Sequence, residues 1–392
     1  MKTQASKPLR TRTNGDNTRF RILTLISATT LSAVLAITPC LAAQDDRECK
    51  HAKFVTIDVP GAGTGNGEGT YALGSNAAGA VVGGYLDAGN DFHGFLRSRD
   101  GTFTTFDGPG AGAGSGYFTI AWSINPAGAI AGGYTDSSYV EHGFLRDPDG
   151  SITTFDAPGA GTGQYQGTYA FNINPAGTAS GFYIDANYVT HGFLRDRDGA
   201  ITTFDVPGAA ATIPGDQDGS LNPAGAIAGY YVDNTSVYHG FLRAPDGTFT
   251  TFSVPGAGTG SGQGTLAWSI NGAGEIAGDY LDPNNVWHSF MRARDGAITT
   301  FDAPGAGTAY RQGTFGAEID PSGAITGSYV DAANVSHGYL RVRGGAITVF
   351  DVPGAGTDTG QGTNPSSINT RGTITGVYFD ATNTAHGFFR IP

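Results

Sequence analysis

Seven histidines recur through most of this sequence, and each has an aspartate six residues before it. Successive histidines are separated by 49, 49, 48, 49, 49 and 49 residues. A carboxylate beside an imidazole is the side-chain pair that general bases and metal sites use. The seven pairs are Asp87 and His93, Asp136 and His142, Asp185 and His191, Asp233 and His239, Asp282 and His288, Asp331 and His337, and Asp380 and His386.

The repetition of these pairs favours a structural role over a catalytic one. A catalytic site needs one asymmetric group of residues, whereas a pair present in every copy is typical of contacts that a repeated fold makes with itself. Antiparallel pairing across the Asp149-Gly150 turn predicts that His142 lies near Asp156, which is Ser253 in one copy. We therefore expect a hydrogen-bond network, with metal or ligand binding as the alternative, and predict no catalytic residue.

Aromatic side chains near these pairs differ from copy to copy, and ligand specificity would reside in such variation. Amphipathic rings suit sugar faces and protein contacts. A strand that packs aromatic residues in any case is the alternative explanation. The candidate ligand-binding residues are Phe92, Tyr139, Tyr188, Tyr238 and Trp287, and Tyr117, Tyr165 and Tyr310 lie in other loops expected on the same face.

One connection, between Asp205 and Asn222, departs from the others. It is a residue shorter and contains Asp216 and Asp218, which could start a calcium loop although the later ligands of that pattern are absent. An ordinary polar turn is the alternative, and no other metal and no cofactor is predicted. The PGAGTG connections do not match a phosphate-binding loop, since no Lys-Ser or Lys-Thr follows them.

A repeat of about 49 residues must position all these groups. One copy, Ser123 to Gly163, divides into four short extended segments. Asn125-Pro126-Ala127-Gly128 suits a type I turn, and Asp149-Gly150 is a hairpin signal between the third and fourth segments. Phe144 and Leu145 are adjacent and therefore point to opposite faces of a strand, so both faces must be buried.

The predicted fold class is all-β, a seven-bladed β-propeller of four-stranded blades. Closure into a ring leaves only short sheet edges. The chain stops at Arg390 to Pro392 without a fourth strand, while Phe54 to Pro60 matches ITTFDAP and precedes any first strand. We therefore predict that this N-terminal strand joins the C-terminal blade and closes the ring. Arg146 and its six equivalents are expected to pair within or between blades.

The N-terminus predicts export. Basic residues precede an apolar run, Ile22 to Ile37, and small residues follow it, which is a signal peptide pattern. The predicted organisation is a signal peptide over residues 1–43, a short linker over 44–53 and a single propeller over 54–392.

The predicted location is secreted or periplasmic in a bacterium. No later run is long and apolar enough for a membrane span. Cys40 is expected to leave with the signal peptide, which makes Cys49 a lone thiol and provides no disulfide framework.

Composition excludes some partners. Without residues 1–43 the chain has 16 Lys and Arg against 33 Asp and Glu, a net charge of −17, and it is rich in glycine, with 63 in the whole sequence. Such a surface repels phosphate groups, so nucleic acid and anionic lipid are poor partners. Cations, neutral sugars and basic proteins are compatible with this charge.

The repeated HGFLR-x-x-DG-x-ITTFD-x-P, with INPAGxIAGxY before it, resembles the HAF repeat of bacterial extracellular proteins. The resemblance covers nearly all of residues 54–392. In that family a His, a small residue, Phe and an apolar residue precede a DG turn; here the small residue is Gly in six copies and Ser289 in one. The resemblance implies export and repeat architecture, and the family carries no settled biochemical activity.

The function favoured by these features is a binding or interaction module for a glycan or protein ligand, acting through the face that carries the long loops. One alternative is a polysaccharide lyase or hydrolase. An enzyme is less favoured because it requires one copy to depart from the rest with a paired acid and base, and the evident departure is Asp216 to Gly219. The other alternative is a structural surface repeat protein.

Overall fold

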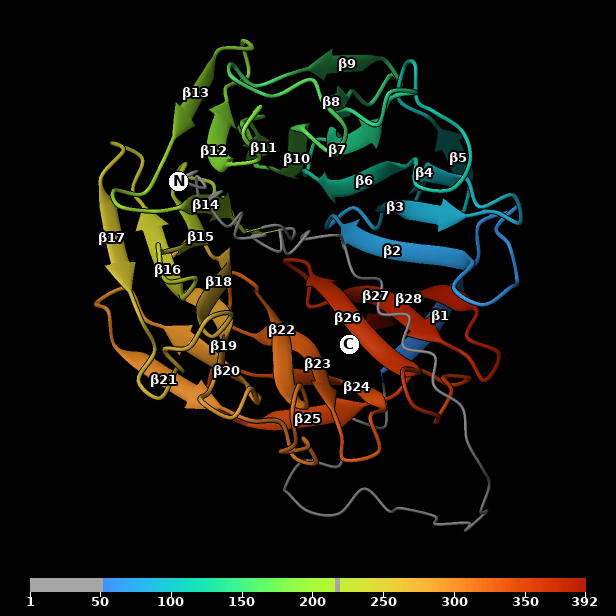
Figure 1. The fold of residues 1–392 in the computed structure, drawn as a ribbon. Helices are drawn as coiled ribbons and strands as arrows, with labels where there is room; N and C mark the ends of the chain where they lie inside the picture. The colour runs from blue at the N-terminus through green and yellow to red at the C-terminus, as the bar shows by residue number, and fades with distance from the viewer. Residues whose placement is uncertain (1–51, 216–218) are drawn as a thin grey trace, which may run out of the picture. The chain divides into compact units, whose positions relative to one another are not determined.

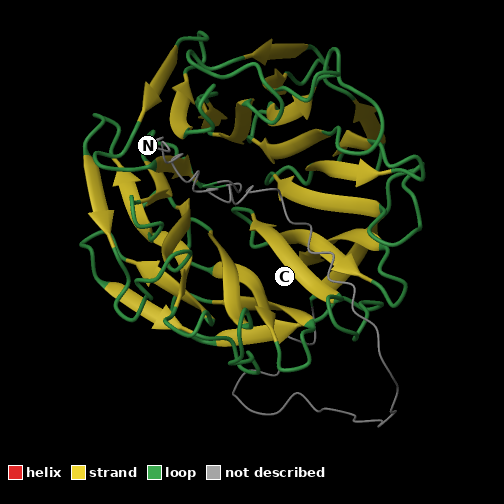
Figure 2. Cartoon of the chain, viewed as in Figure 1, coloured by secondary structure: helices red, strands yellow, loops and turns green. Residues whose placement is uncertain are grey.

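The computed structural model describes residues 52–215 and 219–392, and every regular element in them is a β-strand (Figure 1; Figure 2). The predicted signal peptide, Cys49, Asp216 and Asp218 lie outside the described residues. Within the described ranges there is no helix with the length and apolar character needed to cross a membrane.

The strands follow one another in a repeating order of four. The first strands of this order are β2 (Gly69–Ser75), β6 (Thr119–Ile124), β10 (Gly167–Ile173), β14 (Ala211–Pro214), β18 (Gly264–Ile270), β22 (Gly313–Ile319) and β26 (Gly362–Ile368). The second strands are β3 (Val81–Leu86), β7 (Ile130–Thr135), β11 (Ala179–Ile184), β15 (Ile227–Val232), β19 (Ile276–Leu281), β23 (Ile325–Val330) and β27 (Ile374–Phe379). The third strands are β4 (Phe92–Arg97), β8 (Glu141–Arg146), β12 (Thr190–Arg195), β16 (Tyr238–Arg243), β20 (Trp287–Arg292), β24 (Ser336–Arg341) and β28 (Ala385–Ile391). The fourth strands are β5 (Phe103–Phe106), β9 (Ile152–Phe155), β13 (Ile201–Phe204), β17 (Phe249–Phe252), β21 (Ile298–Phe301) and β25 (Ile347–Phe350).

The remaining strand, β1 (Lys53–Ile57), comes first in the chain and pairs with the last. It runs antiparallel to β28, from Lys53 opposite Ile391 to Ile57 opposite Gly387. The same register joins β5 to β4, where Phe106 lies opposite Gly94. β1 therefore occupies, beside β28, the place that a fourth strand occupies beside a third.

Local turn chemistry sets the register within each group. The strands β6, β7, β8 and β9 pair antiparallel in chain order. Gly128 N donates to Asn125 O at 3.0 Å and Gly150 N donates to Asp147 O at 2.9 Å, which confirms the two predicted turns. Gly150 has a φ of 94°, a conformation that glycine adopts without strain.

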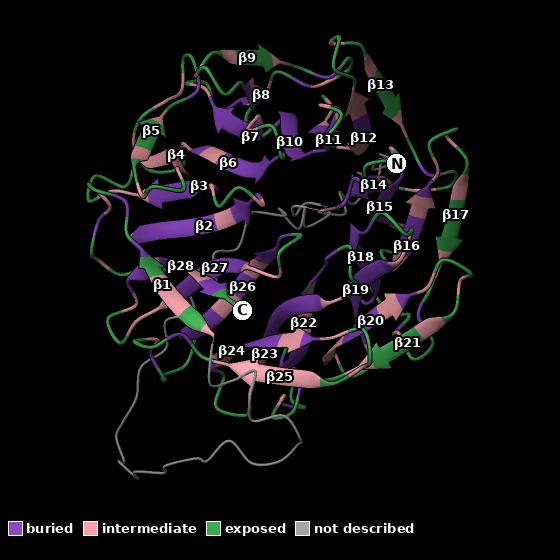
Figure 3. Ribbon diagram, turned by 180° about the vertical axis from the view of Figure 1, so that it is seen from behind, coloured by how far each residue is buried: buried purple, intermediate pink, exposed green. Residues whose placement is uncertain are grey.

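Burial decreases from the first strand to the fourth. Every residue of β10 is buried, whereas the two central residues of β9 are exposed, and Figure 3 shows the same contrast across the molecule. The core lies between neighbouring groups: Phe144 of β8 is fully buried and meets Phe106 of the preceding group at 5.9 Å between ring centroids. Leu145, on the opposite face of β8, is partly buried against the next cluster, which contains Phe193. Both faces of the strand therefore pack against neighbours, as the adjacent apolar residues predicted.

A hydrogen bond and a cation–π contact also recur between neighbouring groups. Thr168 Oγ1 accepts a hydrogen bond from Ala157 N at 2.9 Å, and all seven copies repeat it. The Arg146 guanidinium lies 5.0 Å from the centre of the Phe106 ring, in reach of a cation–π interaction. Five equivalents do the same: Arg195, Arg243, Arg292, Arg341 and Arg390. These arginines therefore bind one group to the next, as predicted.

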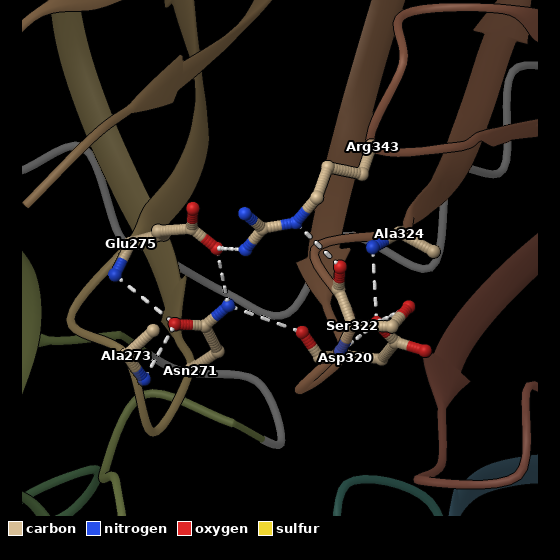
Figure 4. A network of polar contacts seen from close by, with 7 residues as sticks. All are labelled: Asn271, Ala273, Glu275, Asp320, Ser322, Ala324 and Arg343. Atoms are coloured by element: carbon tan, nitrogen blue, oxygen red, sulfur yellow. Dashed lines mark hydrogen bonds and ion pairs between the residues drawn. The ribbon is translucent and has the colours of Figure 1, made fainter.

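Asparagines at the first turns form a ladder along the groups. Asn369 Nδ2 donates to Asn76 O at 3.2 Å and so links the last group to the first. Figure 4 shows the step at Asn271, whose Nδ2 donates to Asp320 O at 3.2 Å and to Glu275 Oε2 at 2.8 Å. Arg343 Nη2 donates to the same Glu275 oxygen at 2.7 Å. Asp320 stands where the other copies have asparagine, and its carboxylate has no side-chain N–H to extend the ladder.

Candidate functional site

Two kinds of loop lie at one end of the strand groups: the loop between the second and third strands, and the connection from the fourth strand to the next group. We call this end the long-loop face. The two kinds touch, since Ala111 bridges to Asp136 and Gly112 N donates to Thr135 O at 2.9 Å. The shorter turns lie at the opposite end, because successive strands within a group run antiparallel.

Each repeated histidine lies on this face beside one or two aspartates. His142 Nδ1 is 3.0 Å from Asp156 Oδ1, and its Nε2 is 3.6 Å from Asp136 Oδ2. Six copies have the Nδ1 contact to an aspartate. In the seventh, Ser253 Oγ lies 2.9 Å from His239 Nδ1. The predicted contact of His142 with Asp156, and its exception at Ser253, are confirmed.

The aspartate six residues before each histidine is held by the backbone of its own loop. Asp136 Oδ1 accepts hydrogen bonds from Ser138 N at 2.8 Å and Val140 N at 2.9 Å. Burial opposes the ionised form of Asp136, but these bonds and His142 outweigh it, so the pKa of Asp136 lies below its usual value. The geometry supports a hydrogen-bond network that stabilises the loop. In the six copies with two aspartates, the two carboxylates keep the network negatively charged even when the imidazole is protonated.

Three of the histidines should titrate above the usual range. The hydrogen bond to Asp156 raises the pKa of His142 against the opposing effect of burial, and equivalent aspartates do the same for His288 and His337. The resulting stabilisation is complete below the unfolded pKa of about 6.5 and is lost as the pH rises through the folded pKa. An NMR titration of the ring protons should give midpoints above about 6.5 for all three; lower midpoints would contradict the assignment.

Three of the five candidate aromatic residues pack within the fold. Phe92, Tyr238 and Trp287 begin third strands and are half-buried. The Phe92 ring lies 5.5 Å from that of Tyr71. Tyr238 and Trp287 join one hydrophobic cluster with Leu266. Their position therefore favours packing over contact with a ligand.

Tyr139 and Tyr188 lie at loop tips, where the structure brings two further tyrosines to them. The Tyr139 ring stacks on Tyr117 at 4.4 Å between centroids and lies 5.8 Å from Tyr165. Tyr188 Oη donates at 3.3 Å to the carbonyl of Gln164, the residue before Tyr165. The relative exposure is 45% for Tyr165 and 64% for Tyr188. We call Tyr117, Tyr139, Tyr165 and Tyr188 the tyrosine row.

Three residues of the row adopt a left-handed backbone conformation. The φ angles of Tyr139, Tyr165 and Tyr188 are 62°, 60° and 62°. For a bulky residue this conformation costs about 1 kcal/mol or more, and asparagine and glycine tolerate it better. Other copies have Asn90, Ser236, Asn285, Asn334 and Asn383 where these loops have Tyr139 and Tyr188. At the position of Tyr165, four copies have glycine, at Gly67, Gly116, Gly262 and Gly360, and one has Arg311 with a φ of 60°. Tyrosine therefore stands where the fold alone favours a smaller residue.

The long-loop face is strongly acidic. In the described part of the chain its loops contain sixteen carboxylates: Asp58, Glu68, Asp87, Asp91, Asp107, Asp136, Asp156, Asp185, Asp205, Asp233, Asp282, Asp302, Asp331, Asp351, Asp358 and Asp380. Among the same residues, Arg311 is the single Lys or Arg. Its guanidinium lies 5.5 Å from the centre of the exposed Tyr310 ring.

Sequence reasoning did not identify two buried carboxyl groups. Asp279 Oδ2 accepts a hydrogen bond from Trp268 Nε1 at 2.7 Å, and Oδ1 accepts one from Ser289 Oγ at 2.8 Å. Burial raises the pKa of Asp279 to about 7. Burial likewise raises the pKa of Glu141 to about 8, and the Thr135 hydroxyl donates to it at 2.9 Å. Both groups therefore titrate far above the usual carboxyl range.

An alignment of the copies contains the signal that was missed. Asp279 lies opposite Ser289 on the neighbouring strand. In two other copies the corresponding cross-strand pairs are glycine with glycine, at Gly84 and Gly94 and at Gly133 and Gly143. A glycine pair replaced by an acid and a hydroxyl in one copy is a coordinated departure from the repeat.

No metal centre accompanies these groups in the described chain. Within residues 52–215 and 219–392, no group of three or more His, Cys, Asp or Glu is placed to hold a metal ion. A depression of about 520 Å³ is lined by Glu275, Ala293, Arg294 and Asp295, at the short turns. It therefore lies at the opposite end from the tyrosine row.

Comparison with known proteins bears on the fold. No protein-family model matches this sequence, and a search of curated proteins found no match. Solved structures similar to this chain include streptogramin B lyase, with a TM-score of 0.50 and 12% identity over 86% of this chain and 97% of that chain. The β-propeller domain of the Trilobed protease from Pyrococcus furiosus has a TM-score of 0.50 and 9% identity over 84% of this chain and 95% of that chain.

A further likeness is to a prolyl endopeptidase, with a TM-score of 0.55 and 11% identity over 81% of this chain and 50% of that chain. At identities this low the likeness concerns the fold alone. The chain is all-β, and its structural neighbours are β-propellers.

Proposed function

We propose that the protein is an exported carbohydrate-binding module built on a closed seven-bladed β-propeller. In this proposal each group of four strands is a blade, and β1 completes the blade formed by β26, β27 and β28. The pairing of β1 with β28 and the hydrogen bond from Asn369 to Asn76 O support closure. The likeness to a solved propeller domain supports the fold.

Export and kinship with HAF-repeat proteins belong to the same proposal. Export rests on the signal peptide pattern over residues 1–43, and kinship rests on the repeated HGFLR and DG segments. A secreted or periplasmic location follows from the pattern. Extracellular polysaccharides are accessible to a protein in that location.

The tyrosine row is the observation that carries the carbohydrate proposal. Exposed aromatic rings stack on the apolar faces of sugars, and the phenol hydroxyls can bond sugar hydroxyls. Among the described residues, the exposed large hydrophobic side chains are Tyr165, Tyr188, Tyr310 and Ile391, so tyrosine dominates this class. Backbone strain at tyrosines in positions that other copies give to Asn, Ser or Gly is typical of functional sites.

The decisive variant replaces three tyrosines of the row with the residue that most other copies have at the same position: Tyr139→Asn, Tyr165→Gly and Tyr188→Asn. We expect it to lose about a hundredfold or more in affinity for the glycan that the intact protein binds, because stacking of each ring contributes about 1 kcal/mol. Its thermal midpoint should equal or exceed that of the intact protein, because the strain is removed. A panel of immobilised oligosaccharides identifies the ligand, and isothermal titration calorimetry measures the loss.

The matched control is Tyr310→Asn, which removes an exposed tyrosine of the same face outside the row. It should leave glycan affinity unchanged. A panel that stays blank with the intact protein refutes the proposed function, and a triple variant that binds as tightly as the intact protein refutes the assignment of the site.

A further inference from the structure

The segments that carry the tyrosine row combine aromatic rings with negative charge. Residues 107–118, 136–140, 156–166 and 185–189 hold one tyrosine of the row each and contain no Lys or Arg. Each of these segments begins with an aspartate: Asp107, Asp136, Asp156 and Asp185. Every segment that carries a ring of the row therefore also carries a carboxylate and no cationic side chain of Lys or Arg.

Two of these carboxylates are open to solvent. The side chains of Asp107 and Asp156 are 50% and 51% exposed. Asp107 contacts Nδ1 of His93, and Asp156 contacts Nδ1 of His142; each of these histidines also faces a second aspartate. Two carboxylates and one imidazole keep a net negative charge whether or not the imidazole is protonated. Asp91 accepts a hydrogen bond from Gly114 N and adds a carboxylate beside the connection that carries Tyr117.

The single Lys or Arg in the described loops of this face belongs to another part of the fold. Arg311 lies in the connection from β21 to β22, whereas the row spans the groups from β5 to β12. An acidic glycan on the row would meet repulsion without a compensating guanidinium, and a neutral glycan would be little affected. A protonated amine would be attracted and could donate charge-assisted hydrogen bonds to the exposed aspartates.

We infer that the tyrosine row selects a glycan that carries protonated amines, such as a de-N-acetylated amino-sugar polymer, over neutral and acidic glycans. The inference rests on the proposed function, since the rings bind the sugar faces and the aspartates select by charge. Rings and carboxylates act on different parts of the ligand, so the two claims can be tested separately.

The test uses three β-1,4-linked hexasaccharides, of glucose, of glucosamine and of glucuronate, with the full mature chain. At pH about 6 most of the glucosamine amines are protonated. The glucosamine hexamer should bind about tenfold more tightly than the glucose hexamer at about 10 mM salt, and the difference should shrink at about 300 mM salt. The glucuronate hexamer should bind most weakly of the three.

A charge variant isolates the aspartates. Asp107→Ser with Asp156→Ser copies the serine that one repeat already has, Ser253, whose Oγ keeps the contact to the histidine. The glucosamine-hexamer affinity should fall about threefold or more at about 100 mM salt, while the glucose-hexamer affinity, which also reports correct folding, stays unchanged. The matched control, Asp302→Ser with Asp351→Ser, makes the same change on connections outside the row and should leave both affinities as they are.

The possible outcomes separate the two claims. Equal affinity for the three hexamers, or tightest binding of the glucuronate hexamer, overturns the charge selection and leaves carbohydrate binding standing. Binding of none of the three overturns the inference, and the oligosaccharide panel then decides whether the proposed function stands. A preference for glucosamine that persists in the Tyr139→Asn, Tyr165→Gly, Tyr188→Asn variant assigns the selection to another surface and overturns the inference.

Discussion

A chain that begins at Gly61 will unfold at a temperature about 10 °C or more below that of a chain that begins at Ala52. The missing segment contains β1, whose Ile57 is 1% exposed, and Val59, which is 3% exposed; both pack in one core cluster with Phe95. Loss of each buried aliphatic side chain costs about 1 to 4 kcal/mol, and the pairing with β28 is lost as well. Differential scanning calorimetry of the two chains measures the difference.

A circular permutant distinguishes loss of closure from general damage. Residues 52–60 are moved to the C-terminus and joined to Ile391 by the turn of Asp147–Ser151, which connects a third strand to a fourth elsewhere in the chain. Lys53 already lies opposite Ile391, so a tight turn can span the new junction. The permutant should melt within a few degrees of the intact chain, and the same fusion with a scrambled strand should not.

Two results would refute the closure proposed for β1. One is a truncated chain that melts like the intact one, and the other is a permutant as unstable as the truncated chain. Neither would alter the repeat itself, because the other strand groups are assembled from segments consecutive in sequence.

Asp279→Asn should stabilise the protein at alkaline pH and leave its stability at about pH 4 nearly unchanged. Burial raises the pKa of Asp279 to about 7 in the folded chain, far above the value of about 4 that an aspartate has in an unfolded chain. The folded state therefore binds its proton more tightly than the unfolded state, so the unfolding free energy falls as the pH rises from about 4 to about 7 and then levels off. The difference between the variant and the intact protein should reach about 2 to 4 kcal/mol above pH 8.

Asparagine suits this site because it reproduces the hydrogen bonds of the protonated acid. Its Oδ1 can accept from Trp268 Nε1 and Gly316 N, which both donate to Asp279 Oδ2 at 2.7 Å, and its Nδ2 can donate to Ser289 Oγ. Urea unfolding at a series of pH values measures the effect. Asp295→Asn, in an exposed turn where Oδ1 accepts from Ala297 N, is the control that makes the same replacement at a carboxyl outside the core. Parallel pH profiles for Asp279→Asn and the intact chain would show that the carboxyl is ionised throughout.

The features that the sequence predicted depend on residues close together in the chain. The Asp149-Gly150 turn sets the register of the strands on either side of it, so counting along them places Asp156 beside His142, 14 residues away. The pairing of β1 with β28 joins residues more than 300 apart, yet it was predicted because the last repeat lacks a strand that the N-terminus supplies.

The site was predicted only in part, because it depends on contacts between separate loops. Phe92, Tyr139 and Trp287 are all aromatic residues near a repeated histidine, and only the tertiary structure separates the two rings that begin strands and pack within the fold from the one at a loop tip. The stacking of Tyr139 on Tyr117 joins two loops whose relative positions are set by the connections between strand groups. The hydrogen bonds of Asp279 also depend on contacts between separate strand groups. Asp279 Oδ2 accepts a hydrogen bond from Gly316 N, which belongs to a strand of the next group.

By itself, the sequence determined the repeat, the strand order within each copy and the local partner of each histidine. Those features follow from turn residues and strand alternation, which act over a few residues at a time. The tertiary structure alone decided which aromatic rings are exposed, which tyrosines adopt left-handed conformations, and that Asp279 is a buried acid. These properties depend on how neighbouring strand groups pack against each other, and burial and ring contact arise only once distant segments meet.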